Sequence, residues 1–172
     1  MQMKDSATRH ARMGPELVPM WQHYGLLAAV AFLVFCADQV TKAIVTRTLA
    51  HGNVVIILGG AAQLEYARNT GAAFSLFRAG GALFAVIAIV VSVGILVYYR
   101  RTSGGPFLVR LALGGILGGA LGNLVDRVRL GYVVDFIDFR WWPVFNVADS
   151  CIVVGVLLLV LQSLMTDQKD RT

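Results

Sequence analysis

Four apolar runs, each long enough to cross a lipid bilayer, constrain this chain more than any other feature of its sequence. The runs cover residues 24–45, 82–99, 107–125 and 147–165. The hydrocarbon core of a bilayer is about 30 Å thick, and a helix needs about 20 residues to cross it. Hydrophobic residues make up 57% of the chain and charged residues only 15%. The sequence therefore predicts an all-α integral membrane protein with four transmembrane helices.

The connection between the first and second runs has a different pattern. Residues 50–81 contain short β-like runs, NVVIIL and AQLEYA, with Gly59, Gly60, Asn69 and Gly71 between and after them. Such punctuation is typical of strands joined by turns. We expect a small β-rich lobe here, within a single membrane-embedded domain over 1–172 whose residues 1–22 and 166–172 are polar tails.

Orientation depends on where the basic residues lie. Lys and Arg divide almost evenly between the two sides of the predicted bundle, so their plain number decides nothing. The connection after the second run is purely basic, however, with Arg100 and Arg101, whereas the opposite side also carries acidic residues that can pair with its bases. Because basic loops favour the cytoplasm, we place this connection and both tails there, and the β-rich lobe on the outer side.

Most of the polar residues in or beside the spans lie, according to the order and direction of the spans, at one surface of the membrane. Four alternating spans bring the end of the first, the start of the second, the end of the third and the start of the fourth to the same surface. Ionisable groups inside a membrane are costly and usually mark a site. The sequence thus predicts one polar pocket at the lobe side, formed by Asp38, Lys42, Asn69, Asn123, Asp126, Arg127, Asp135, Asn146 and Asp149.

Several of these residues have a structural interpretation beside a chemical one. Asp38 and Lys42 are one helical turn apart and can neutralise each other. Asp126 can hold the end of the third helix, and Asn69, in the turn-like sequence NTG, can close that turn through its side chain. Asp138 reads as a solvated loop residue. For these residues the sequence leaves both interpretations open.

Asp135 and Asp149 differ, because neither has an obvious counter-ion nearby in the sequence. Asp135 follows two valines, and Asp149 opens the last apolar run. A helix N-terminus favours the anion of Asp149 while desolvation favours the neutral acid, so the two carboxyls can share one proton. That arrangement is an aspartic dyad, in which one carboxylate accepts a proton from water and the other carboxyl polarises the scissile carbonyl.

Other functions fit less well. The basic residues form no stripe with aromatic residues, which argues against a nucleic-acid partner. The histidines belong to no metal-binding motif, so we expect no metal and no cofactor. A serine–lysine peptidase built on Ser150 and Lys42 has nothing to place the two in contact. A proton-coupled transporter predicts polar residues through the full membrane depth, and an assembly protein using glycines 114, 115, 118, 119 and 122 leaves the carboxylates unexplained.

Taken together, five motifs resemble those of one family, the bacterial lipoprotein signal peptidases, also called signal peptidase II. The motifs are DQVTK (38–42), RNTGAAFS (68–75), GGALGNLVDR (118–127), GYVVDF (131–136) and FNVADS (145–150). The resemblance implies an aspartic endopeptidase of the bacterial inner membrane with four transmembrane helices and a small periplasmic β-rich cradle. It implies cleavage of prolipoproteins just before a diacylglyceryl-modified cysteine, and inhibition by globomycin-type peptides.

The resemblance also implies roles for individual residues. It places the catalytic dyad on Asp135 and Asp149. It places substrate-binding or dyad-supporting residues at Asp38, Lys42, Asn69, Gly71, Asn123, Asp126, Arg127, Asn146 and Ala148. The spacer between the two dyad residues, FIDFRWWPVFNVA, is compact for that family, which implies a short flap over the substrate. Trp141 and Trp142 in this spacer are residues that suit a membrane interface.

Overall fold

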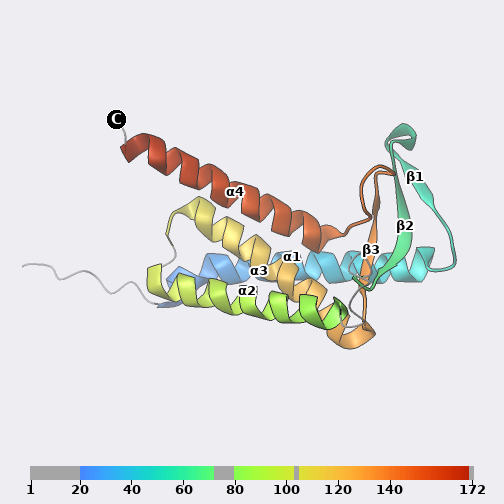
Figure 1. Ribbon diagram of the computed structural model, residues 1–172, viewed down its shortest axis with the longest axis horizontal. Coiled ribbons are helices and arrows are strands. Elements are labelled where there is room, and N and C mark those ends of the chain that lie inside the picture. The colour runs from blue at the N-terminus through green and yellow to red at the C-terminus, as the bar shows by residue number, and fades with distance from the viewer. Residues whose placement is uncertain (1–19, 72–79, 103–104, 171–172) are drawn as a thin grey trace, which may run out of the picture.

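In the computed structural model, four long helices lie side by side and a small sheet lies across one end of them (Figure 1). The structure describes residues 20–71, 80–102 and 105–170. The helices are α1 (Met20–Leu49), α2 (Gly80–Thr102), α3 (Phe107–Leu130) and α4 (Val147–Asp170). Each is long and apolar enough to cross a membrane. The predicted four-helix architecture is confirmed, and the chain is a multi-pass membrane protein.

The helices at the two ends of the chain extend into the predicted tails. The tail segments 1–19 and 171–172 lie outside the described residues. Within the described part, α1 begins at Met20, and α4 continues through residues 166–170 as helix. The last apolar run therefore belongs to a helix that is longer than its hydrophobic portion.

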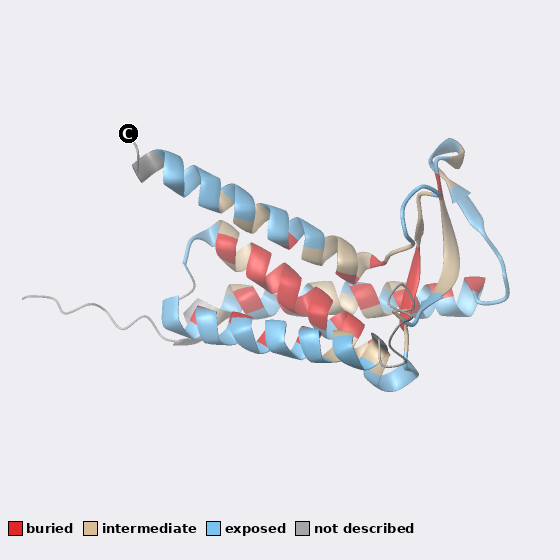
Figure 2. Ribbon diagram, in the orientation of Figure 1, coloured by how far each residue is buried: buried red, intermediate tan, exposed pale blue. Residues whose placement is uncertain are grey.

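Helix α3 is the central element of the bundle (Figure 2). Of its most apolar window, 67% is buried inside the protein, against 22% for α1 and 11% for both α2 and α4. An apolar helix with most of its surface exposed is typical of a membrane span that faces lipid. Helices α1, α2 and α4 therefore present their outer faces to lipid, and each packs on α3 with its inner face.

The glycines of α3 explain how the neighbouring helices approach so closely. A Cβ atom on Gly118 would lie 2.5 Å from the carbonyl oxygen of Ala31 on α1, and a Cβ on Gly119 would lie 2.5 Å from that of Ala148 on α4. The predicted packing role of these glycines is confirmed. The spacing of four residues produces two adjacent stripes, so that α3 receives a different helix on each.

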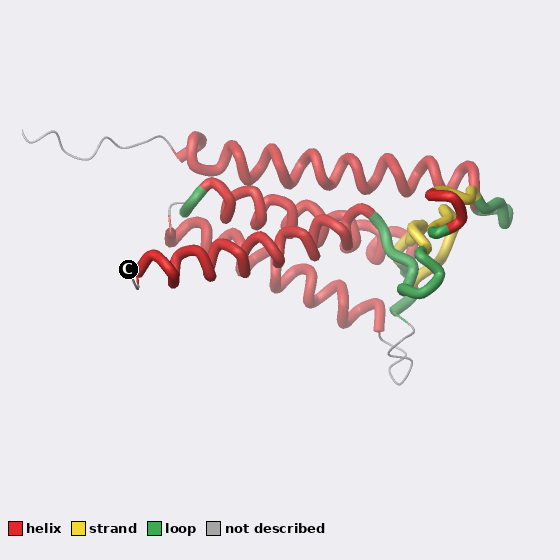
Figure 3. Tube along the Cα trace, turned by 90° about the horizontal axis from the view of Figure 1, so that it is seen from above, coloured by secondary structure: helices red, strands yellow, loops and turns green. Residues whose placement is uncertain are grey.

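The strands gather at one end of the helices (Figure 3). They form a sheet of three antiparallel strands in the order β1-β2-β3. Strands β1 (Val55–Ile57) and β2 (Ala62–Asn69) come from the predicted lobe and are joined by the 3-10 turn η1 (Leu58–Gly60). Strand β3 (Val133–Asp138) comes instead from the connection between α3 and α4. The lobe is thus completed by a segment far away in the sequence.

The sheet shares its core with the end of α1. Val45 and Leu49 of α1 are buried together with Phe136 of β3, and Leu64 and Tyr66 of β2 pack against them. A sheet this small cannot bury an apolar face by itself and needs a packing partner. The last turns of α1 therefore fix β2 and β3 over the ends of the bundle, where the polar residues of the spans emerge.

Candidate functional site

All the site residues predicted from the sequence lie at the bundle end that carries the sheet. Helix α1 contributes a buried acid and a buried base, and α3 contributes three polar residues. The rest come from β2 and the turn after it, from β3, and from the first turn of α4 with the residue before it. The site residues are Asp38, Lys42, Asn69, Gly71, Asn123, Asp126, Arg127, Asp135, Asn146, Ala148 and Asp149. The remainder of the motif RNTGAAFS, residues 72–75, lies outside the described residues.

Lys42 is the centre of a buried ion network. Its Nζ lies 2.8 Å from Oδ2 of Asp38 and 2.9 Å from Oδ2 of Asp126. It also donates a hydrogen bond of 2.9 Å to Oδ1 of Asn123. The predicted ion pair within α1 is confirmed, and the structure adds a second carboxylate from α3. One cation thus neutralises two buried acids and binds a neighbouring amide.

Asp38 joins three helices at one point. Its Oδ1 accepts a hydrogen bond of 3.1 Å from the backbone N–H of Ala148, at the start of α4. A Cβ on Gly122 of α3 would lie 2.5 Å from Oδ2 of Asp38, so only glycine leaves room for the carboxylate. Asp38 and Ala148 are completely buried. Gly122 is therefore required by the site as well as by helix packing.

Gln39 is a site residue that the sequence reasoning missed. Its Nε2 donates to Oδ2 of Asp38 and to Oδ1 of Asp126, at 3.1 and 3.2 Å. The signal was present, since Gln39 is a polar residue inside the span directly after Asp38. Asp126 in turn accepts a 3.2 Å hydrogen bond from the N–H of Val134. As predicted, Asp126 holds the end of α3, but through donors from α1 and β3.

Asn146 and Asp149 begin α4 with a reciprocal pair of hydrogen bonds. The side-chain Oδ1 of Asn146 accepts from the N–H of Asp149 at 2.9 Å, and Oδ2 of Asp149 accepts from the N–H of Asn146 at 3.3 Å. This is the geometry of a capping box, with aspartate in the place of the usual glutamate. The cap fixes the Asp149 carboxylate at the helix N-terminus, where the helix dipole favours a negative charge.

Two amide side chains connect Asp135 to Asp149. Nδ2 of Asn146 donates to Oδ1 of Asp135 at 2.7 Å, and Nδ2 of Asn123 donates to Oδ1 of Asp149 at 2.7 Å. Nδ2 of Asn146 also donates to Oδ1 of Asn123 at 3.1 Å. Among the described residues, neither carboxyl has an ion-pair partner. The two acids predicted to meet are therefore joined by one chain of amide hydrogen bonds.

Asn69 binds Asp135 from the opposite side. Its Nδ2 donates to Oδ2 of Asp135 at 2.9 Å, while its Oδ1 accepts from the N–H of Gly71 at 2.9 Å, which confirms the predicted turn closure. Burial of Asp135 raises the pKa of this carboxyl to about 6, and the charge of Asp149 acts in the same direction against the hydrogen bonds from Asn69 and Asn146. Asp135 thus retains a proton at weakly acidic pH more readily than an exposed aspartate.

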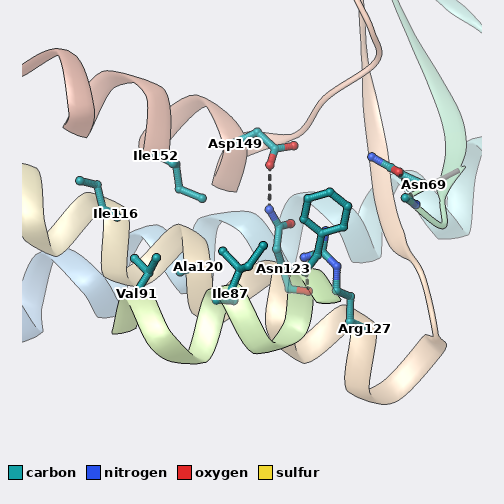
Figure 4. Close-up of a pocket in the computed structure, with 12 residues that line it drawn as sticks. Asn69, Ile87, Val91, Ile116, Ala120, Asn123, Arg127, Asp149 and Ile152 are labelled. Atoms are coloured by element: carbon teal, nitrogen blue, oxygen red, sulfur yellow. Dashed lines mark hydrogen bonds between the residues drawn. The ribbon is translucent and has the colours of Figure 1, made fainter. Parts of the chain in front are cut away.

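A cavity of about 430 Å³ opens beside Asp149 and Asn123, between α2, α3 and α4 (Figure 4). Its polar end also contains Asn69 and Arg127, and the Arg127 guanidinium lies 5.3 Å from the ring centre of Phe84. Asp135 is 1% exposed and borders this space through Asn69. Away from the polar end the lining is apolar: Ile87, Ala88, Val91, Ile116, Ala120 and Ile152.

The remaining features of the spacer lie outside this network. Asp138, at the end of β3, accepts hydrogen bonds from Nε2 of Gln63 at 2.8 Å and from the N–H of Arg140 at 2.6 Å. Trp141 and Trp142 are 78% and 58% exposed.

Within the part of the chain that the structure describes, no group of His, Cys, Asp and Glu side chains is arranged to hold a metal ion.

Comparisons with known proteins agree with one another. A family model described as signal peptidase (SPase) II matches residues 30–165. The lipoprotein signal peptidases of Halothermothrix orenii and Symbiobacterium thermophilum are 46% and 43% identical to this chain, over 77% and 84% of its length and 90% and 95% of theirs. A bacterial membrane enzyme solved at 2.3 Å by the in meso method superposes with a TM-score of 0.76 at 30% identity, covering 86% of this chain and 92% of its own. The chain therefore belongs to the signal peptidase II family.

Proposed function

We propose that this protein is an aspartic endopeptidase that removes the signal peptide from prolipoproteins and cuts on the N-terminal side of the diacylglyceryl-modified cysteine. Its relatives are lipoprotein signal peptidases. The observation that carries the proposal is the pair Asp135 and Asp149, linked through Asn146 and Asn123 at the polar end of an apolar cavity. Two carboxyls at one site, neither of which forms an ion pair with another described residue, are the chemistry of a dyad that holds one proton.

In the proposed reaction Asp149 is the base and Asp135 is the acid. Asp149 lines the cavity, and its anion is stabilised by the start of α4 and by Asn123. It accepts a proton from water as the water oxygen bonds to the scissile carbonyl carbon, while protonated Asp135 transfers its proton to the carbonyl oxygen. The resulting diol then collapses, the C–N bond breaks, and the new amino group takes the proton from Asp149. The dyad recovers its single proton when the carbonyl reforms.

The buried ions support the dyad by orienting an amide. Lys42 donates to Oδ1 of Asn123, so the NH₂ group of that amide must face Asp149. Asp38 and Asp126 hold the ammonium in place from two sides. Lys42 is thus a positioning residue in this proposal, acting on Asp149 through Asn123. Arg127 and Phe84 border the cavity where substrate enters, and the isoleucines accept its apolar portion.

The proposal includes a place in the cell. We place the protein in the bacterial inner membrane with both termini in the cytoplasm and the site near the periplasmic face. The exposed Trp141 and Trp142 lie on the connection that follows β3, at the site end of the bundle, and suit the membrane–water interface. Substrates then reach the site from within the lipid, and water reaches it from the periplasm. Globomycin-type peptides are expected to compete with substrate, and we expect no cofactor and no nucleic-acid partner.

A cleavage assay with trapping tests the reaction type. Purified protein in lipid vesicles is mixed with diacylglyceryl-modified prolipoprotein and hydroxylamine, and the products are weighed by mass spectrometry. We expect a protein that begins with the modified cysteine and a signal peptide that ends in a free carboxylate, because water attacks directly. A signal-peptide hydroxamate, or a covalent enzyme adduct lost in Ser150→Ala, would show an acyl-enzyme and exclude the dyad.

The pKa of Asp135 gives a prediction about pH. The pKa of the Asp135 carboxyl is raised to about 6, and the carboxyl must be protonated to act. The cleavage rate is therefore expected to fall as the pH rises through the titration of the pair. The hydrogen bond from Asn69 lowers that pKa, so Asn69→Ala is expected to move the alkaline limb of the kcat profile to higher pH. The measured quantity is the pH at the midpoint of the alkaline limb, which can be compared between variants even when their maximal kcat values differ. A limb that stays in place or moves to lower pH contradicts Asp135 as the acid.

A further inference from the structure

An exposed cation on the sheet is held against two tyrosine rings. The guanidinium carbon of Arg68, on β2, lies 5.7 Å from the ring centre of Tyr66 and 5.1 Å from that of Tyr132. Both distances are within the range of cation–π attraction. Nε of Arg68 also donates a hydrogen bond of 3.2 Å to the hydroxyl oxygen of Tyr66, which lies 3.0 Å from the hydroxyl oxygen of Tyr132. We call these three residues the arginine clamp.

The arginine clamp has hydrogen-bond donors to spare. A guanidinium carries five N–H groups, and the hydrogen bond from Arg68 to Tyr66 uses the one at Nε. Among the described residues, none accepts a hydrogen bond from its two terminal nitrogens. The hydroxyls of Tyr66 and Tyr132 carry two hydrogens but form one hydrogen bond with each other, so one O–H remains. A planar fork of N–H groups matches the paired oxygens of a phosphate or a carboxylate.

The charge of Arg68 is not neutralised by another described residue. It forms no ion pair with them, since the two ion pairs of the described residues both belong to Lys42. The acids of the sheet have other donors. Glu65 accepts a hydrogen bond from Gln63, and Asp138 accepts from Gln63 and from a backbone N–H. An anion for Arg68 is therefore expected from outside the described protein.

An exposed apolar surface adjoins the arginine clamp. Helix α3 ends at Leu130, and Gly131, with a φ of 80°, turns the chain toward β3. Because consecutive Cα atoms are about 3.8 Å apart, Tyr132 lies within about 8 Å of Leu130. Val128 and Leu130 are 76% and 45% exposed. Apolar side chains next to a cation and tyrosines, at the end of a membrane span, are typical of the level where acyl chains meet lipid headgroups.

We propose that the arginine clamp binds the phosphate of a membrane phospholipid, whose acyl chains cover Val128 and Leu130. The terminal N–H groups of Arg68 and the remaining tyrosine O–H donate to the phosphate oxygens. A peptide carboxylate would meet the same donors but would leave the two apolar side chains uncovered. The residue after Arg68 is Asn69, which binds Asp135. Bound lipid thus fixes the level of the site relative to the headgroups, and the binding itself does not depend on the peptidase reaction.

Lipid titrations in detergent test this proposal. The purified full-length protein in a maltoside is mixed with dioctanoyl phosphatidylglycerol, dioctanoyl phosphatidylethanolamine, dioctanoylglycerol or glycerol 3-phosphate, and the complexes are quantified by native mass spectrometry. We expect both phospholipids to bind. Dioctanoylglycerol has the same chains without a phosphate, and glycerol 3-phosphate has the phosphate without chains. Each should bind at least about 10-fold more weakly, because it lacks either the charge-assisted hydrogen bonds or the apolar contact.

Variants of Arg68 show whether its guanidinium is the binding group. Arg68→Gln should weaken phosphatidylglycerol binding by about 10-fold, and Arg68→Lys by about 3-fold, because lysine keeps the charge but lacks the planar fork. The control Arg47→Gln removes an exposed basic residue at the same end of the bundle and should bind as the wild type does. Since Arg68 is exposed, its variants should unfold at the wild-type temperature without lipid.

Three outcomes of the titrations overturn the proposal. Equal losses in Arg47→Gln and Arg68→Gln would show attraction to the general surface charge. Equal binding of dioctanoylglycerol would show an apolar patch alone, and equal binding of glycerol 3-phosphate would show a site for free phosphate. A phosphatidylglycerol with a photoreactive diazirine in its headgroup tests the wild type directly. It should label β2 or residues 131–133, and unlabelled phosphatidylglycerol should compete. Label that is absent from both segments also overturns the proposal.

Discussion

Asp149→Asn and Asp135→Asn are each expected to lower the cleavage rate of the lipidated substrate by about 10²- to 10⁴-fold, the range for losing a general acid or base. An asparagine at position 149 cannot accept the proton of water, and one at position 135 cannot hold the shared proton. Each substitution keeps the volume of the side chain and an oxygen that accepts from Asn123 or Asn146. The loss should therefore appear in kcat, with little change in the thermal unfolding temperature.

Asp138→Asn is the matched control for this prediction. It makes the same chemical change on the same strand as Asp135, but its partners are Gln63 and the N–H of Arg140. We expect nearly wild-type cleavage from this variant. Full activity in either dyad variant would remove that residue from the mechanism. An equal loss in Asp138→Asn would show instead that any disturbance of β3 stops the reaction.

Lys42→Met is expected to destabilise the protein by about 3–5 kcal/mol, the usual cost of removing one partner from a buried ion pair. Lys42 is 3% exposed and contacts both Asp38 and Asp126, so methionine leaves two carboxylates buried without their cation. The measurement is the free energy of unfolding in mixed micelles. The same variant should lose activity even where it remains folded, because Asn123 is no longer held toward Asp149.

Two further variants make the Lys42 result interpretable. Arg47→Met removes a basic residue from an exposed position on the same helix and should change the unfolding free energy by less than about 0.5 kcal/mol. The triple variant that adds Asp38→Asn and Asp126→Asn to Lys42→Met should recover part of the lost stability, because it leaves no uncompensated charge. If the free energy of unfolding of Lys42→Met lay within about 1 kcal/mol of the wild-type value, the result would contradict the role of the ion network in stabilising the fold.

The sequence alone determined the features that depend on local spacing and hydropathy. The four spans follow from the length of their apolar runs, since bilayer thickness sets that length. Alternation of the spans then sends the polar ends of α1, α3 and α4 to one side, whatever the packing. The contact between Asp38 and Lys42 follows from their separation of one helical turn, and the glycines of α3 indicated close packing through their spacing of four.

Only the tertiary structure decided which distant residues meet. The second partner of Lys42, the role of Gln39 and the amide bridge through Asn123 and Asn146 all join elements that are far apart in the chain. The third strand of the sheet, which carries Asp135, pairs with β2, although α2 and α3 lie between the two strands in the sequence. These contacts depend on the rotation of each helix about its axis and on where β3 lies, and side-chain packing fixes both. Periodicity in the sequence shows which face of a helix carries the polar residues or the glycines. The packing of the core decides which residues of other elements that face contacts.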